Sequence, residues 1–318
     1  MRATKLPIVN NNKWGDDGSG FSCLNVLNQG ESFQVTFEWT GDASTVKGFP
    51  HMKADPERLP VQLWNISTLH FAGKWSTTVE GTDGQSPQEQ AAAYDDTGLK
   101  TNAAIDMFLS DDITNSTGLG PPIEIMIWLW YVPAILPLGH SESTPENDTV
   151  EVEGTNFSLY HGWNAASQHV FSWLPHQNLT SSDADYSSLL RYIWEDRGLL
   201  SGALYLGQLE FGAEVMHAGL TTTFEASDYE LALYREGDED DPLPKTTSTT
   251  SSSATATASS TSTRSVSSSA PTTESSAPTE SSSSALPLAL SLHQKLCLAL
   301  PLLVSACSGS LMFMSVMI

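Results

Sequence analysis

One stretch constrains this chain most: residues 121–130, PPIEIMIWLW, are almost wholly apolar and carry a single carboxylate, Glu124. A strand repeats every two residues, so it would place Glu124, Met126 and Trp128 on one face and isoleucine and leucine on the other. The aliphatic face fits a hydrophobic core, and the face with Glu124 fits a groove for a ligand that is both polar and flat, such as a sugar ring. A carboxyl group among apolar side chains resists ionisation unless it has a partner, so Glu124 is a candidate for acid/base or nucleophilic chemistry. The alternative is a core strand with one glutamate at its edge.

Short strands are predicted throughout residues 1–235, which we expect to form one domain. The segment Ser32–Trp39 (SFQVTFEW) alternates apolar and polar residues without a break. Further strands are expected at residues 61–66, 74–79, 103–109, 123–129, 156–160, 170–174, 203–211 and 221–234. Clusters of turn residues separate them, which predicts an all-β fold, a jelly-roll β-sandwich with a curved sheet. Residues 181–197 carry apolar residues at helical spacing, with Gly198 just beyond, which predicts one short helix.

The charge of the chain limits its ligands. A formal net charge of −23 argues against a nucleic-acid partner, because phosphate binding needs clustered lysine and arginine. Nine tryptophans suit a folded domain with an uncharged ligand. We expect neither a cofactor nor a metal ion, since the acidic run at 236–241 lacks the ligand spacing and closing glutamate of a calcium loop.

The C-terminal part of the chain differs in composition from the rest. Residues 236–284 are acidic at first and then almost wholly Ser, Thr, Ala and Pro, which is typical of an O-glycosylated stalk that cannot bury enough apolar surface to fold. Residues 285–318 are apolar, follow a small-residue site and precede no basic cluster, which is the pattern of a GPI-attachment signal. The alternative is a tail-anchored membrane helix. We therefore expect an extracellular protein held at the cell surface, at the membrane or the wall, by a lipid anchor.

Five N-glycosylation sequons also favour passage through the secretory pathway. They begin at Asn65, Asn115, Asn147, Asn156 and Asn178. The first residues, MRATKLPIVNNNKWG, nevertheless lack the apolar segment of a signal peptide.

A partner for Glu124 would complete a glycosidase site. Retaining hydrolysis of a glycosidic bond needs two carboxyl groups, one that attacks the anomeric carbon and one that donates and later accepts a proton. Residues 208–219, QLEFGAEVMHAG, offer both Glu210 and Glu214, which share the same parity along a strand. The pattern alone does not separate these two candidates.

An ordered series of motifs covering residues 8 to 235 resembles glycoside hydrolase family 12, the small endoglucanases and xyloglucan-specific endoglucanases of fungi and bacteria. The matching segments are VNNNKWG at 9–15, EWTGDASTVKGFP at 38–50, IDMFLS at 105–110, EIMIWL at 124–129, LYHGWN at 159–164, VFSWLP at 170–175 and FGAEVMHAG at 211–219. The fourth segment matches the family's nucleophile strand residue for residue. The resemblance implies a jelly roll whose concave sheet forms a cleft for a β-glucan, and hydrolysis with retention of configuration.

The resemblance also implies a role for individual residues. Glu124 corresponds to the nucleophile and Glu214 to the general acid/base, which leaves Glu210 without a role. Asp106 corresponds to the acid that hydrogen-bonds the nucleophile. Trp14 corresponds to a sugar-stacking platform. Met126 and Trp128 share the nucleophile's face and are expected to line the cleft floor.

We expect Glu124 to be ionised and Glu214 protonated in the free enzyme, because a neighbouring anion raises the pKa of the second acid, and we expect an acidic pH optimum. The expected function is that of a monomeric, retaining endo-β-1,4-glucanase acting on cellulose-type glucan or xyloglucan. Two alternatives are a cell-surface transglycosylase and a non-catalytic carbohydrate-binding protein of the cell wall.

Two departures from the family pattern affect these expectations. Residues 131–139, YVPAILPLG, are bulkier and more apolar than the family's glycine-rich turn, so the rim of the cleft and the choice of substrate are expected to differ. Family members carry a cysteine before the NNxWG segment that pairs with the position of Cys23, and this chain has none there. A truncated start is the hypothesis that the missing cysteine and signal peptide favour, and a reactive free thiol at Cys23 is the alternative.

Overall fold

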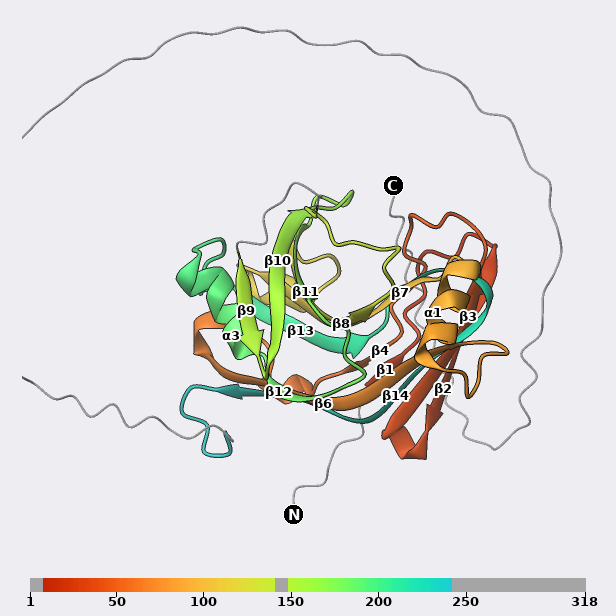
Figure 1. Cartoon of the computed structure of the whole chain (residues 1–318). Coiled ribbons are helices and arrows are strands. Elements are labelled where there is room, and N and C mark those ends of the chain that lie inside the picture. The colour runs from red at the N-terminus through yellow and green to blue at the C-terminus, as the bar shows by residue number, and fades with distance from the viewer. Residues whose placement is uncertain (1–7, 141–147, 242–318) are drawn as a thin grey trace, which may run out of the picture. The chain divides into compact units, whose positions relative to one another are not determined.

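The computed structural model describes residues 8–140 and 148–241, which form two curved β-sheets packed against each other (Figure 1). The first layer, called the inner sheet below, carries the site residues. In spatial order its strands are β1 (Ile8–Asn10), β4 (His51–Lys53), β13 (Tyr205–Gly212), β7 (Lys100–Ser110), β8 (Ile123–Tyr131), β11 (His169–Pro175), β10 (Thr155–Trp163) and β9 (Thr149–Val152). Among these neighbours only β8 and β11 run parallel.

The second layer, called the outer sheet, lies beneath the inner sheet in Figure 1. In spatial order its strands are β2 (Gly20–Leu27), β3 (Ser32–Trp39), β14 (Val215–Arg235), β6 (Ile66–Val79) and β12 (Ser181–Asp185). The two layers are joined where the start of β14 pairs with the start of β7, Val215 opposite Thr101. This jelly-roll sandwich is the predicted fold class.

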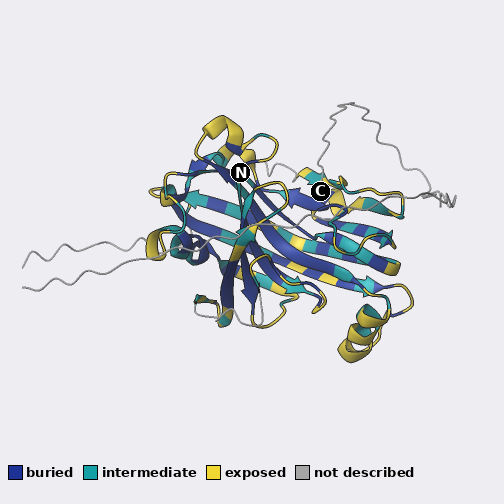
Figure 2. Cartoon of the chain, turned by 90° about the horizontal axis from the view of Figure 1, so that it is seen from above, coloured by how far each residue is buried: buried dark blue, intermediate teal, exposed yellow. Residues whose placement is uncertain are grey.

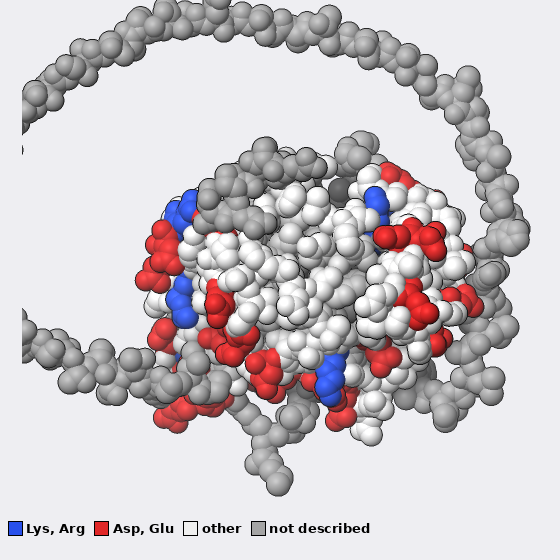
Figure 3. All heavy atoms as spheres, in the orientation of Figure 1, with Lys and Arg blue, Asp and Glu red and all other residues white. Residues whose placement is uncertain are grey.

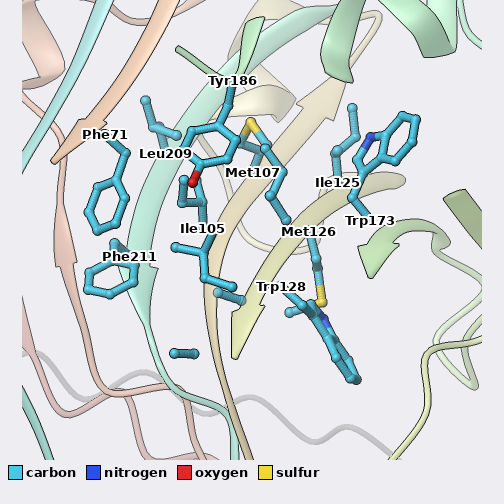
Figure 4. Close-up of a cluster of buried hydrophobic side chains, with 14 of the residues drawn as sticks. Phe71, Ile105, Met107, Ile125, Met126, Trp128, Trp173, Tyr186, Leu209 and Phe211 are labelled. Atoms are coloured by element: carbon cyan, nitrogen blue, oxygen red, sulfur yellow. The ribbon is translucent and has the colours of Figure 1, made fainter. Parts of the chain in front are cut away.

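The hydrophobic core lies between the sheets and follows from the alternation of the strands. In β3 the alternate residues Phe33, Val35, Phe37 and Trp39 are fully buried. From the inner sheet Phe211 meets Phe71 of β6, with ring centroids 4.3 Å apart (Figure 4). Each such side chain contributes about 1.5–3 kcal/mol by burial. Figure 2 shows the buried residues concentrated along the strands and the exposed ones in the connecting loops.

Two local predictions were wrong in part. The strand expected at 61–66 is only β5 (Val61–Gln62), followed by the 3-10 turn Leu63–Asn65. The helix expected at 181–197 begins late, because residues 181–185 form β12 and pair with β6. Asp185 ends that strand, one residue before the N-cap Tyr186, and its carboxylate accepts hydrogen bonds from the backbone N–H and the hydroxyl of Ser187, both at 2.9 Å. The helix itself is α3 (Ser187–Arg191), continued by a π-helical turn (Tyr192–Asp196).

The structure also contains helices that the sequence analysis does not predict. The longest is α1 (Pro87–Asp96), in which no residue is buried, so it has no apolar periodicity to detect. It begins instead with a capping box between Ser86 and Glu89 and with Pro87 in its first turn. A shorter helix, α2 (Ile113–Ser116), precedes β8.

The predicted stalk beyond residue 241, the predicted GPI signal and the sequon at Asn147 lie outside the described residues. Within residues 8–140 and 148–241, no helix is long and apolar enough to cross a bilayer. The sequons at Asn115, Asn156 and Asn178 are exposed and Asn65 is half-buried. Cys23 of β2 is disulfide-bonded, so the free-thiol alternative is wrong.

Candidate active site

Three adjacent strands of the inner sheet, β13, β7 and β8, bring the predicted acids together. Their register sets Glu210 opposite Asp106 and Asp106 opposite Met126 in one cross-strand row. Glu124 lies two residues before Met126 on β8 and therefore on the same face of the sheet. Glu214 follows the end of β13 by two residues. Residues separated by about 90 positions in sequence thus share one surface.

Glu214 is held in place by the neighbouring strand β7. The side-chain N–H of Asn102 donates to Glu214 Oε2 at 2.5 Å, and Asn102 Oδ1 accepts the backbone N–H of Glu214 at 3.0 Å. The hydroxyl of Thr101 donates to the backbone carbonyl of Glu214 at 2.6 Å. Asn102 is fully buried and was not predicted as a site residue. Its signal in the sequence is an amide that opens the segment NAAIDMFL, whose one other polar residue is Asp106.

The two catalytic candidates influence each other's ionisation. Burial raises the pKa of Glu124 to about 8, the charge of Glu214 adds to the rise, and a hydrogen bond with Asp106 opposes it. Burial also raises the pKa of Glu214 to about 7, opposed by the hydrogen bond from Asn102. Both acids are therefore protonated at acidic pH in the unliganded protein, whereas the sequence analysis expects Glu124 to be ionised. The physical reason is that desolvation acts on both carboxyl groups and outweighs the hydrogen bond to Glu124.

Asp106 lies between the other acids and is 4% exposed. Burial first, and then the charges of Glu124, Glu210 and Glu214, raise its pKa well above the ordinary range of an aspartate. The neutral carboxylic-acid form of Asp106 is therefore favoured, and in that form Asp106 can donate a hydrogen bond to a carboxylate. The interaction between Asp106 and Glu124 favours the ionised form of Glu124, which is the effect that the sequence resemblance implies.

The predicted sugar-contacting residues differ in exposure. Met126 and Trp128 share the face of Glu124 but are each only 4% exposed, and Trp128 packs against Tyr131 with ring centroids 5.9 Å apart. In Figure 4 these two side chains lie apart from the pair Phe71–Phe211. They therefore form a packed base beneath the acids, with little surface of their own.

Trp14 is 55% exposed in the segment that follows β1. Its neighbour Lys13 bridges to Gly48, which bridges to Val215, the residue after Glu214. Adjacent strands lie about 4.8 Å apart, so the backbone beside Trp14 is about 10 Å from the backbone beside Glu214. The structure thus places the backbone beside Trp14 on the same side of the inner sheet as the backbone beside Glu214.

The loop that leaves β8, residues 132–139, shapes the side of the site away from Glu214. Val132 and Ile135 are buried, whereas Leu136 and Leu138 are exposed. Gly139 has φ +81° and lies against β10, where an added Cβ would be 2.1 Å from the carbonyl oxygen of His161. Because β10 is two strands away from β8, the loop passes β11 and forms an apolar rim. The prediction of a bulkier loop at this position is consistent with these contacts.

Several observations define the ligand that the site can hold. Figure 3 shows acidic side chains towards the margins of one face and a broad uncharged area between them, which fits an uncharged ligand. In the part of the chain that the structure describes, no group of three or more His, Cys, Asp or Glu side chains is arranged to hold a metal ion. A cavity of about 490 Å³ lies elsewhere, between β12, β6 and the β9–β10 turn, and contains none of these acids. The carboxylates therefore define the site, and the cavity does not.

A β-sandwich whose inner sheet brings two half-buried glutamates beside a buried aspartate fits a hydrolase class, the glycoside hydrolases that work with two carboxyl groups. The sequence pattern of Glycosyl hydrolase family 12 matches residues 7–233. The chain belongs to this family.

Solved structures share the fold. The catalytic domain of Humicola grisea Cel12A, in complex with a soaked thio cellotetraose, is 24% identical, with a TM-score of 0.56 over 71% of this chain and 92% of that one. A family 12 xyloglucanase from Bacillus licheniformis is 21% identical, with a TM-score of 0.57 over 71% and 92% of the two chains. The xyloglucanase domain of NopAA from Sinorhizobium fredii, in complex with cellobiose, is 18% identical, with a TM-score of 0.55 over 71% and 93%.

Proposed function

We propose that this protein is a retaining endo-β-1,4-glucan hydrolase acting on cellulose-type glucan or xyloglucan. The observation that carries the proposal is the pair Glu124 and Glu214, which share one half-buried surface and are close enough for the charge of Glu214 to raise the pKa of Glu124. Membership of family 12 and the cellotetraose and cellobiose bound to structures of the same fold support the choice of a β-glucan.

In the first step the carboxylate of Glu124 attacks the anomeric carbon and the glycosidic C–O bond breaks. The carboxyl proton of Glu214 passes to the leaving oxygen, so the departing sugar is neutral. Asp106 donates a hydrogen bond to Glu124 and favours the ionised form that this attack requires. Asn102 orients the Glu214 carboxyl group through its 2.5 Å hydrogen bond.

In the second step Glu214, now a carboxylate, accepts a proton from water, and the water oxygen attacks the anomeric carbon. The bond to Glu124 breaks, its carboxylate is restored and the product keeps its configuration. Glu214 thus needs a pKa that lets it both release and accept a proton near the working pH. Its raised pKa of about 7 meets that requirement.

The test uses the full chain, assayed on xyloglucan, carboxymethyl-cellulose and mixed-linkage glucan beside Glu124→Gln. We expect shortened chains from at least one glucan, an initial β-anomer seen by proton NMR, and loss of at least about 10³-fold of activity in the variant. An initial α-anomer would refute retention. Products longer than the substrate would favour transglycosylation, and binding without product from any of the three would favour a non-catalytic carbohydrate-binding protein.

We also propose that the enzyme acts at the cell surface, carried by its Ser/Thr-rich stalk and anchored through glycosylphosphatidylinositol. The composition of residues 236–318 and the exposed sequon residues Asn115, Asn156 and Asn178 support this location. Phosphatidylinositol-specific phospholipase C should release the protein from intact membranes. Extraction by detergent alone, with no release by the phospholipase, would favour a membrane-spanning tail.

A further inference from the structure

A buried charge network adjoins the catalytic acids, and the two-carboxylate mechanism makes no use of it. Glu210 of β13 is 3% exposed, and its Oε1 lies 2.6 Å from Lys53 Nζ of β4. Its Oε2 lies 3.2 Å from Nδ1 of His51, which is also buried. The Lys53 side chain is 34% exposed whereas that of Glu210 is buried, so the carboxylate bears most of the desolvation cost and the pair is a poor source of stability.

The register of the sheet directs that charge at Asp106. Glu210 and Asp106 are directly opposite each other on β13 and β7, where Cβ atoms lie about 4.5–5.5 Å apart. Two carboxylates so close cannot both ionise without a large cost. Glu210 has the ammonium group of Lys53, whereas Asp106 is surrounded by Glu124, Glu210 and Glu214. The proton therefore resides on Asp106 and the charge on Glu210.

The orphaned oxygen of Asp106 agrees with this assignment. Asp106 Oδ1 is buried and has no hydrogen-bond partner. An unpartnered oxygen costs far less on a neutral carboxylic acid than on a buried carboxylate. The neutral form is therefore the one that the site can accommodate.

His51 does not supply a second cation. Its Nδ1 lies 2.7 Å from the carbonyl oxygen of Phe49, which can only accept, so Nδ1 carries the hydrogen. Its Nε2 is buried without a partner, and burial lowers the pKa of the ring. His51 is thus neutral and directs its Nδ1–H at Phe49 and Glu210. Of the described side chains within ion-pair distance of Glu210, Lys53 alone brings a full positive charge.

We propose that Glu210, ion-paired with Lys53, is a positioning residue that acts through Asp106: its negative charge keeps the proton on Asp106, which can then donate to Glu124. Its effect on activity rests on the proposed hydrolase function, but its effect on Asp106 does not. The groups that face Asp106 are Glu124 from β8, Glu210 from β13 and Glu214 from the link after β13.

Loss of the Glu210 charge should change the pKa of Asp106 in a definite direction. Without the charge of Glu210, the pKa of Asp106 falls, and Asp106 ionises at a lower pH. It then loses its donor hydrogen and adds a charge beside Glu124, which opposes the ionisation of the nucleophile. Activity on the alkaline side requires the protons of both Glu214 and Asp106, so an earlier ionisation of Asp106 should move the alkaline limb of the pH–rate profile to lower pH.

The first experiment needs no substrate. In the full chain, difference infrared spectroscopy should show protonated-carboxyl bands near neutral pH, and Asp106→Asn should remove one of them while those of Glu124 and Glu214 remain. In Glu210→Gln this band should titrate at a pH lower by about one unit or more. Glu225→Gln is the control, because Glu225 lies on β14 of the outer sheet, where it accepts a hydrogen bond from Gln34, and the variant removes the same charge. It should leave the band unchanged.

The second experiment measures kcat/KM against pH. Glu210→Gln should move the alkaline limb to lower pH, and Glu225→Gln should not move it. If the single variant does not fold, Glu210→Gln combined with Lys53→Gln removes the unpaired ammonium group and serves in its place. A lowered melting temperature with unchanged titration of Asp106 would overturn the proposal and leave Glu210 a structural role only. Absence of hydrolysis would refute the proposed function, and the infrared titration would still decide the role of Glu210.

Discussion

The hydrogen bond between Asn102 and Glu214 offers the sharpest test of the acid/base assignment. Asn102→Ala removes the donor that lies 2.5 Å from Glu214 Oε2. A hydrogen bond to a charged group contributes about 1.5–3 kcal/mol, and one pKa unit corresponds to about 1.4 kcal/mol. Because the bond favours the ionised carboxylate, its loss should raise the pKa of Glu214 by about 1–2 units above its present value of about 7.

This shift has a direct kinetic signature. If Glu214 is the general acid, its deprotonation sets the alkaline limb of kcat/KM, and Asn102→Ala should move that limb to higher pH by about 1–2 units. The substitution also leaves the backbone N–H of Glu214 without its acceptor, so the free energy of unfolding should fall by about 1–3 kcal/mol.

Thr101→Val is the matched control. The Thr101 hydroxyl donates to the backbone carbonyl of Glu214 and does not contact its carboxylate. This variant should lower the free energy of unfolding by about 1 kcal/mol and leave the alkaline limb in place. An unmoved limb in Asn102→Ala, or an equal shift in Thr101→Val, would refute the assignment of that limb to Glu214.

Three further predictions concern single substitutions. Glu124→Gln should be more stable than the wild type at pH 8, by about a few kcal/mol, and equally stable near pH 4. The folded wild type holds the proton of Glu124 up to about pH 8, whereas the unfolded chain releases it near pH 4.5, so the free energy of unfolding of the wild type falls as pH rises between these values. Urea titrations of both proteins at pH 4 and pH 8 would measure the difference. Trp14→Ala should raise KM for a soluble glucan by about 2–10-fold and leave the melting temperature unchanged, because the ring is mostly exposed; an unchanged KM would remove Trp14 from the binding surface. Gly139→Ala should lower the free energy of unfolding by about 2 kcal/mol or more, because it adds a clash with His161 to backbone strain. Gly154→Ala is the control: Gly154 has φ +80° but open space around it, so this variant should lose less stability. Equal losses in the two variants would show that the loop does not press against β10.

The ionisation of the site changes one expectation about pH. The sequence analysis expects an acidic optimum, in which Glu124 is already ionised. In the structure burial raises the pKa of both glutamates, so the singly protonated pair forms closer to neutral pH. Asp106 and Asn102 each counteract this effect with one hydrogen bond to a carboxylate. A pH optimum measured on the wild type would show how far these two bonds offset the desolvation.

The sequence alone determined which side chains share a face within one strand. The alternation of EIMIWLW along β8 places Glu124 on one face of a strand, because side chains of a strand alternate by covalent geometry whatever the rest of the fold does. The alternation in Ser32–Trp39 likewise predicts β3, and its four apolar residues are all fully buried. Local patterns of this kind need no information about neighbours.

Only the tertiary structure decided which side chains act on one another. Glu210 and Asp106 are about 100 residues apart, and nothing local to either segment sets them opposite each other; the register of β13 against β7 does. The same register brings Asn102 to Glu214. The protonation of the site follows from these contacts and from burial, which depend on long-range packing that strand periodicity does not encode.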